Sequence, residues 1–207
     1  NNPTGTQVSK ADLTAVLEHF ADTALVVVDE AYIEFDIKST WATQLAAYPN
    51  LVVLRTLSKA FALAGLRCGF TIASEAIIQS LLKVIAPYPI PEPVAQIVAQ
   101  ALTAGNIERM QQQVAFLNEQ RTRLQAELAT RPGVELVGDV KANYILFRHS
   151  HCAQIMQYLV SQGMLIRDQS KQLNLQNCLR VTIGSAEQNQ RLLSLLDAYF
   201  EQAGASL

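Results

Sequence analysis

Two kinds of apolar pattern alternate along this chain. Short continuous runs such as Leu25–Val28 and Leu51–Leu54 are separated by longer stretches in which apolar residues recur on one helix face. Continuous runs are typical of parallel strands that are buried on both faces, and the wider spacing predicts helices. Strands are predicted at 24–28, 51–55, 69–73, 134–137, 143–147, 164–167 and 179–183. Helices are predicted at 12–20, 41–48, 75–85, 92–130 with a break at 104–106, 153–162 and 186–202.

Local signals set the ends of several of these elements. Ser9 is a candidate N-cap for the first helix, because its hydroxyl can accept from a backbone N–H of the first turn. Pro132-Gly133 ends the long helix. Prolines at every second position from 87 to 93 predict a rigid extended segment there, since proline fixes φ and disfavours helix in the residue before it.

The order of the predicted elements changes along the chain. Alternation of strands and helices in the front part predicts an α/β fold with a doubly wound, mostly parallel sheet. The back part predicts a smaller α+β domain that is reached over one long helix. We expect the larger domain at 1–106, the connecting helix at 107–131 and the smaller domain at 132–207.

Composition excludes several classes of function. The chain has 207 residues, of which 50% are hydrophobic and 16% charged, and its net charge is -2 without a run of Lys or Arg. Nucleic acid and anionic membranes are therefore not expected as main partners. Three cysteines without CxxC spacing favour a reduced, cytoplasmic protein. His149 and His151 are two positions apart, but no group of acids or cysteines completes a metal set with them, so we expect no metal site.

Two of the apolar runs lead to residues with complementary chemistry. The first run ends at Asp29, with Tyr32 three residues later, and the second is followed by Ser58 and Lys59. A lysine amine can form a Schiff base with the aldehyde of pyridoxal 5'-phosphate, and an aspartate can hold the pyridine nitrogen protonated. The ends of buried strands are where open α/β sheets bind ligands. Taken singly, the simpler interpretations stay open: a turn acid for Asp29, packing for Tyr32 and a surface charge for Lys59.

A second set of residues could complete such a site. Arg67 lies eight positions after Lys59, between Gly65 and Gly69, where the backbone can approach a ligand closely. With Ser58, it could bind the cofactor phosphate through a two-pronged contact. Asn2 precedes a proline, which holds its backbone extended and can aim its amide at a fixed target, although a turn-forming role is equally consistent.

Two arginines of the predicted small domain are candidates for binding an anion. Arg180 alternates with the apolar residues of its strand, so it lies on the opposite face from them. Arg167 ends the strand at 164–167. Together they would form a clamp for a phosphate or carboxylate, whereas singly each could face solvent.

The ensemble of motifs resembles the fold-type I pyridoxal-phosphate-dependent aminotransferases, and within them the histidinol-phosphate aminotransferase family. The resemblance rests on Asn2-Pro3-Thr4-Gly5, Asp29-Glu30-Ala31-Tyr32-Ile33-Glu34-Phe35, Arg55-Thr56-Leu57-Ser58-Lys59-Ala60-Phe61, Arg67-Cys68-Gly69-Phe70 and Ala86-Pro87-Tyr88-Pro89. It covers the whole chain. A related phosphothreonine decarboxylase branch shares the same skeleton, and a broad-range aromatic aminotransferase is a further alternative.

The resemblance implies a role for each candidate. Lys59 would form the Schiff base and move the proton between the substrate Cα and the cofactor, while Asp29 would pair with the pyridine nitrogen. Asn2 and Tyr32 would bond the ring oxygen, and Ser58 and Arg67 the cofactor phosphate. Arg180, helped by Arg167, would bind the phosphate of histidinol phosphate in one half-reaction and a carboxylate of glutamate or 2-oxoglutarate in the other.

The same resemblance implies a longer protein. The chain opens on Asn1-Asn2-Pro3-Thr4-Gly5 without an initiator Met, and we expect it to be the C-terminal part of a homodimeric enzyme. The family's N-terminal segment would supply an aromatic residue that stacks on the cofactor, donors to its phosphate and a tyrosine from the partner subunit. We therefore expect residues 1–207 alone to be catalytically inactive.

Overall fold

A computed structural model describes residues 2–204 of the chain, and these residues form two compact units. One unit is Val8–Val114, and the other contains the remaining described residues on both sides of it. The division expected from the sequence, 1–106, 107–131 and 132–207, stays a prediction.

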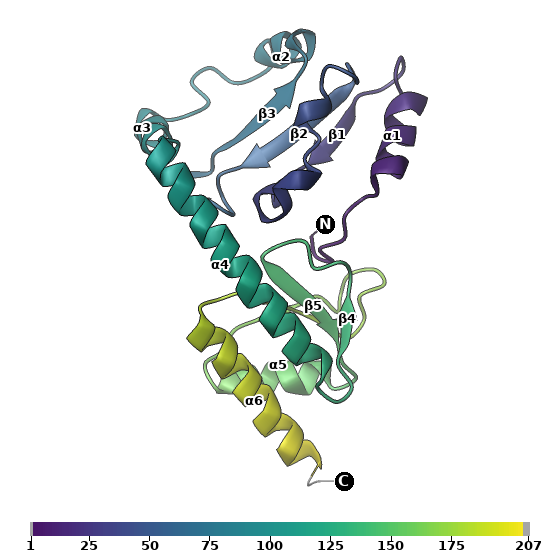
Figure 1. The fold of residues 1–207 in the computed structure, drawn as a ribbon, viewed down its shortest axis with the longest axis vertical. Coiled ribbons are helices and arrows are strands. Elements are labelled where there is room, and N and C mark those ends of the chain that lie inside the picture. The colour runs from purple at the N-terminus through teal and green to yellow at the C-terminus, as the bar shows by residue number, and fades with distance from the viewer. Residues whose placement is uncertain (1, 205–207) are drawn as a thin grey trace. The chain divides into compact units, whose positions relative to one another are not determined.

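The unit Val8–Val114 contains a three-stranded sheet (Figure 1). Its strands are β1 (Val26–Asp29), β2 (Leu51–Thr56) and β3 (Gly69–Ala73), in that order. β1 and β2 are parallel, but β2 and β3 are antiparallel, so the predicted mostly parallel sheet is wrong for the described strands and the sheet is mixed. The link from β2 to β3 contains only the 3-10 turn η3 (Ala64–Leu66), whereas parallel neighbours are usually joined by an α-helical crossover.

One face of this sheet carries the core of the unit. Helix α1 (Lys10–His19) begins where expected, because the Ser9 side chain accepts from the backbone N–H of Asp12. Its apolar residues pack with Trp41 against the sheet; the buried residues of this cluster are Leu13, Leu17, Trp41, Leu51 and Val53. On the opposite face Val27 is 56% exposed and Leu54 is 37% exposed. The prediction that the first strand is buried on both faces is therefore wrong in this structure.

The connections of this unit differ from the predicted helices. The expected helix at 41–48 contains only the 3-10 turn η2 (Ala42–Gln44), and a second 3-10 segment, η1 (Ile33–Ser39), precedes it. The Glu30 side chain accepts from the backbone N–H of Trp41, which fixes the chain just before η2. Helices α2 (Glu75–Leu82) and α3 (Glu92–Ala101) follow, and α4 (Ala104–Ala129) begins after a break at Leu102–Thr103, slightly earlier than expected.

The second unit is an antiparallel sheet with helices on one face (Figure 1). Its strands are β4 (Glu135–Val137), β5 (Tyr144–Arg148), β7 (Cys178–Thr182) and the two-residue β6 (Arg167–Asp168), in the order β4-β5-β7-β6. Side chains of α4, α5 (Cys152–Ser161) and α6 (Ala186–Gly204) form one core with the sheet. This is the α+β arrangement expected for the back part, except that β6 is shorter than the predicted 164–167.

Within the described part of the chain, no helix combines the length and apolar character that a membrane span requires.

Candidate active site

The ends of all three strands of the first sheet meet at one edge. Because β1 and β2 are parallel, Asp29 at the end of β1 lies on the same side as Thr56 at the end of β2. β3 runs in the opposite direction, and its first residue, Gly69, pairs with Thr56. The loops that follow β1 and β2 and the loop that precedes β3 therefore gather at this edge. These loops carry five of the candidates: Asp29, Tyr32, Ser58, Lys59 and Arg67.

Lys59 and Tyr32 come from different loops and lie side by side. The Lys59 Nζ atom is 5.2 Å from the centroid of the Tyr32 ring, within the range of a cation–π contact. Tyr32 is buried, whereas Lys59 is exposed, although Leu57 and Ala60 on either side of it are buried. The apolar flanks of Lys59 thus anchor its loop and leave the amine accessible.

Asp29 stabilises a turn through one carboxylate oxygen, and its side chain is also accessible to solvent. Its Oδ1 atom accepts from the backbone N–H of Ala31 at 2.9 Å, which forms a turn directly after β1. The turn interpretation from the sequence is therefore correct for one carboxylate oxygen. Asp29 is exposed at the sheet edge, so its carboxylate can also meet a ligand.

Hydroxyl groups and a guanidinium lie where β2 ends and β3 begins. The Thr56 hydroxyl donates to Ser58 Oγ at 2.8 Å, and the Ser58 backbone N–H donates to Thr56 Oγ1 at 3.1 Å. Arg67 has φ +53° in the left-handed region, and its Nη1 atom donates to the carbonyl of Ala64 at 3.1 Å. A Cβ at Gly69 would lie 2.7 Å from the Arg55 carbonyl oxygen, so only glycine allows this strand approach.

Thr56 was not singled out from the sequence. Its position could have indicated a role in the site, because Thr56 lies three residues before Lys59 and directly after the predicted strand at 51–55. A threonine is common in strands, so its residue type alone indicates no function for the hydroxyl.

The second unit brings the other three candidates together. Arg167 in β6 pairs directly with Arg180 in β7, so two like charges face each other across the ladder. The Arg180 guanidinium lies 4.8 Å from the centre of the Tyr144 ring and donates to Asn2 Oδ1. Its Nε atom is buried and, among the described residues, has no hydrogen-bond partner. Alternation along β7 is as predicted, with Leu179 and Val181 buried on the other face.

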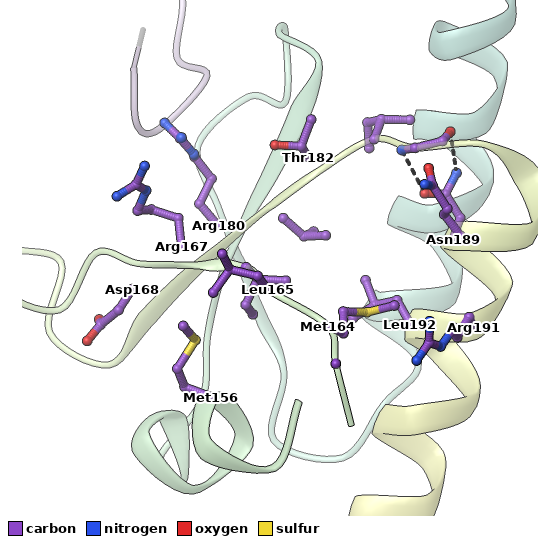
Figure 2. Close-up of a pocket in the computed structure, with 16 residues that line it drawn as sticks. Met156, Met164, Leu165, Arg167, Asp168, Arg180, Thr182, Asn189, Arg191 and Leu192 are labelled. Carbon is purple, nitrogen blue, oxygen red and sulfur yellow. Dashed lines mark hydrogen bonds between the residues drawn. The ribbon is translucent and has the colours of Figure 1, made fainter. Parts of the chain in front are cut away.

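An open pocket of about 830 Å³ adjoins the two arginines. Figure 2 shows Arg167 and Arg180 side by side at one end, and Met164, Arg191 and Leu192 at the other. The pocket forms where the short β6 stops pairing with β7. Asp168 also lines it, and hydrogen bonds from Ser170 hold the pKa of that carboxyl below its usual value. The pocket thus offers three guanidinium groups, those of Arg167, Arg180 and Arg191, and one carboxylate beside apolar walls.

The histidines take structural positions. His149 is buried, its Nε2 atom lies 3.1 Å from the carbonyl of Pro132, and its Nδ1 atom accepts from the His151 backbone N–H at 2.9 Å. Burial lowers the pKa of His149. Among residues 2–204, no three His, Cys, Asp or Glu side chains are grouped as a metal site would require.

Comparison with known proteins identifies the class to which this fold and site belong. Residues 1–196 match the family "Aminotransferase class I and II", and the chain belongs to that family.

Particular members are closely similar to the chain. It is 61% identical over 200 residues to the histidinol-phosphate aminotransferase of Pseudoalteromonas atlantica, covering 97% of this chain and 54% of that protein. It is 50% identical over 196 residues to histidinol-phosphate aminotransferase 1 of Pasteurella multocida, covering 95% of this chain and 56% of that protein. The chain spans about half the length of these relatives. The resemblance expected from the motifs is thereby confirmed.

Solved structures show the same fold. The crystal structure of the histidinol-phosphate aminotransferase from Clostridium acetobutylicum superposes with a TM-score of 0.87 at 23% identity, covering 98% of this chain and 62% of that one. The L-threonine-O-3-phosphate decarboxylase from Porphyromonas gingivalis superposes with a TM-score of 0.80 at 22% identity, covering 97% of this chain and 62% of that one. At these identities the likeness concerns the fold, and the expected aminotransferase fold is confirmed.

Proposed function

We propose that this chain is part of a pyridoxal-phosphate-dependent aminotransferase that acts on histidinol phosphate. The reaction would convert histidinol phosphate and 2-oxoglutarate to imidazole-acetol phosphate and glutamate, a step of histidine biosynthesis. The observation that carries the proposal is the meeting of Asp29, Tyr32 and Lys59 at one sheet edge. High identity to histidinol-phosphate aminotransferases supports the choice of substrate.

The chemistry of the sheet edge fits pyridoxal phosphate. The cofactor has an aldehyde, a ring nitrogen and a phosphate, and each needs a different partner. The edge offers the exposed amine of Lys59 and the carboxylate of Asp29. Thr56, Ser58 and Arg67 add hydroxyl donors and a cation of the kind that binds phosphate. When bound, the cofactor supplies an electron sink for negative charge that develops on the substrate Cα.

The residues of the edge have distinct tasks in this proposal. Lys59 would hold the cofactor through its amine, and the same amine would move the proton at the substrate Cα. The Tyr32 ring beside it limits the positions of the amine and attracts its cationic form. The Asp29 carboxylate keeps the ring nitrogen protonated, because an opposite charge nearby favours the charged form.

The arginines of the second unit are proposed to bind the anionic group of the substrate. Two like charges directly opposite each other on neighbouring strands destabilise a sheet unless an anion compensates them. A phosphate or carboxylate bound by Arg180 and Arg167 would provide that compensation. Asn2 accepts from Arg180 and so helps to hold its guanidinium, and we propose that the Asn2 amide also binds the cofactor ring oxygen.

The proposal is tested with the protein expressed from its complete reading frame. Incubation with histidinol phosphate, 2-oxoglutarate and pyridoxal phosphate is expected to release glutamate. Absence of glutamate would contradict the proposed activity. Loss of carbon dioxide from L-threonine-O-3-phosphate under the same conditions would instead assign the decarboxylase reaction. Sedimentation of the same sample tests the proposed homodimer, and cell fractionation tests the proposed cytoplasmic location.

A further inference from the structure

A buried ion pair connects the two strands whose ends form the candidate active site. The side chains of Glu30 and Arg55 are 3% and 17% exposed. The Nε and Nη2 atoms of Arg55 both lie 3.0 Å from Glu30 Oε2. Glu30 directly follows Asp29, and Arg55 directly precedes Thr56. The pair therefore joins the loop that carries the acid to the strand that leads to the lysine.

The same carboxylate also closes the loop that carries Tyr32. Glu30 Oε1 accepts from the backbone N–H of Trp41 at 2.6 Å, and Glu30 Oε2 accepts from the Thr40 hydroxyl at 2.9 Å. Arg55 Nη2 in turn lies 2.7 Å from Thr40 Oγ1. The chain thus leaves β1 at Glu30, passes through Tyr32 and η1, and returns to the Glu30 carboxylate. Tyr32 is held between two points that are fixed by one side chain.

Stability alone is a weak reason for such a pair. Removing two charges from water carries a desolvation cost, and apolar replacements of buried ion pairs are often as stable or more stable. Multiple short hydrogen bonds instead define one geometry, because each of them constrains both partners. Glu34 also faces Arg55; burial raises the pKa of Glu34, and its Oε2 atom has no hydrogen-bond partner among the described residues. Glu30 is therefore the carboxylate that fixes the orientation of Arg55.

We propose that Glu30 and Arg55 are positioning residues that fix Asp29 and Tyr32 relative to Lys59. The inference rests on the proposed function, since it assigns the pair a role toward the cofactor site. In this arrangement Glu30 and Arg55 do not contact the cofactor themselves, and they affect it through the positions of Asp29, Tyr32 and Lys59. Breaking the pair would let the loop after β1 shift against β2, and the acid, the phenol and the amine would lose their common geometry.

The test uses two single variants and one matched control. In Glu30→Gln the amide oxygen can still accept from Trp41, but the amide N–H groups then meet the donors of Arg55. Arg55→Lys keeps the charge and loses the fork that contacts Glu30 and Thr40. Glu135→Gln makes the same chemical change in the exposed Glu135–Arg148 pair of the second unit, whose N–O distance is also 3.0 Å.

Each protein, expressed from its complete reading frame, is titrated with pyridoxal phosphate and then examined from pH 5 to 10. The readouts are the dissociation constant of the cofactor, the midpoint of the pH titration of its bound absorbance, and thermal unfolding. Glu30→Gln is expected to weaken binding at least about tenfold and to move the midpoint by at least about half a pH unit, because the groups that tune the bound cofactor are displaced. Arg55→Lys should change the dissociation constant and the midpoint of the pH titration in the same direction as Glu30→Gln. The double variant should be no worse than the larger single effect, since both changes remove one interaction.

The outcomes separate the two proposals. If unaltered protein binds no pyridoxal phosphate, the proposed function fails, and the inference fails with it. If unaltered protein binds the cofactor on Lys59 but the variants lower only the unfolding temperature and leave the absorbance midpoint unchanged, the pair is merely structural and this inference alone is overturned. Equal effects of Glu135→Gln on the midpoint would also overturn it.

Discussion

Replacement of Arg180 by alanine tests the substrate site most directly. In the folded protein without substrate, the change removes a cation–π contact with Tyr144 that is worth about 0.5–1 kcal/mol and a hydrogen bond to Asn2 that is worth about 0.5–1.5 kcal/mol. It also removes the repulsion from Arg167 across the ladder, a term of similar size and opposite sign, about 0.2–1 kcal/mol. The free energy of unfolding should therefore decrease by no more than about 2 kcal/mol.

The effect on catalysis should be larger. Loss of a charge-assisted contact to a bound phosphate costs about 2–5 kcal/mol when its partner is left desolvated. Since 1.36 kcal/mol corresponds to a factor of ten, kcat/KM for histidinol phosphate should fall by more than about 30-fold. Steady-state kinetics measures this ratio, and the cofactor absorbance checks that pyridoxal phosphate still binds.

Arg148→Ala is the matched control, because Arg148 lies on the neighbouring strand β5 and pairs with the exposed Glu135. Its kcat/KM should stay within about twofold of the unaltered value, as expected for a surface ion pair. A decrease below about threefold in Arg180→Ala would refute the reasoning, because surface positions rarely exceed that effect. Equal losses in both variants would point to damage of the sheet rather than to an anion site.

Three further predictions concern other parts of the molecule. Borohydride reduction of the protein with bound pyridoxal phosphate, followed by peptide mapping, should place the label on Lys59, and a label on another lysine would exclude the assigned role. Asp29→Ala should lower kcat by at least about 100-fold, because the ring nitrogen loses the charge that keeps it protonated; near-normal kcat with cofactor bound would contradict this. Burial lowers the pKa of His149 in the folded state, so its contribution to stability is present above the unfolded value of about 6.5 and is lost as the pH falls below it. As the pH falls from 7.5 to 5, the free energy of unfolding should decline less steeply in His149→Gln than in the unaltered protein, and identical slopes would rule out this residue as the cause.

The candidates at the first sheet edge could be predicted because strand ends obey a general rule. Asp29 and Lys59 follow apolar runs, and the carboxyl ends of parallel strands lie at one edge of a sheet. The direct pairing of Arg167 with Arg180 could not be predicted, because it depends on the register between β6 and β7. Alternation of residues within one strand gives the face of a side chain but not its neighbour across the ladder.

Glu30 shows a second limit of the sequence pattern. Next to Asp29 it reads as one more polar residue of a strand-end loop, and such residues are mostly exposed. Its burial depends on Arg55, which lies 25 positions away, and on Thr40 and Trp41. The Trp41 N–H that donates to Glu30 lies at the start of the predicted helix at 41–48, of which only the 3-10 turn η2 forms.

In the first sheet, some apolar residues of the strands are exposed although the sequence pattern predicted that they are buried. Val27 and Leu54 are apolar, as expected for strands that are buried on both faces. The apolar runs correctly predicted the strands β1 and β2. The face beneath α1 and Trp41 is covered, however, whereas on the opposite face Val52 is buried and Val27 and Leu54 are exposed. Hydrophobic periodicity reports which faces of a strand can be buried, because burial favours apolar side chains. Whether a face is covered depends on which other segments reach it, and that information lies outside the strand itself. The exposed Val27 therefore corrects the prediction about burial without changing the assignment of the strand, whose end still places Asp29 at the candidate site.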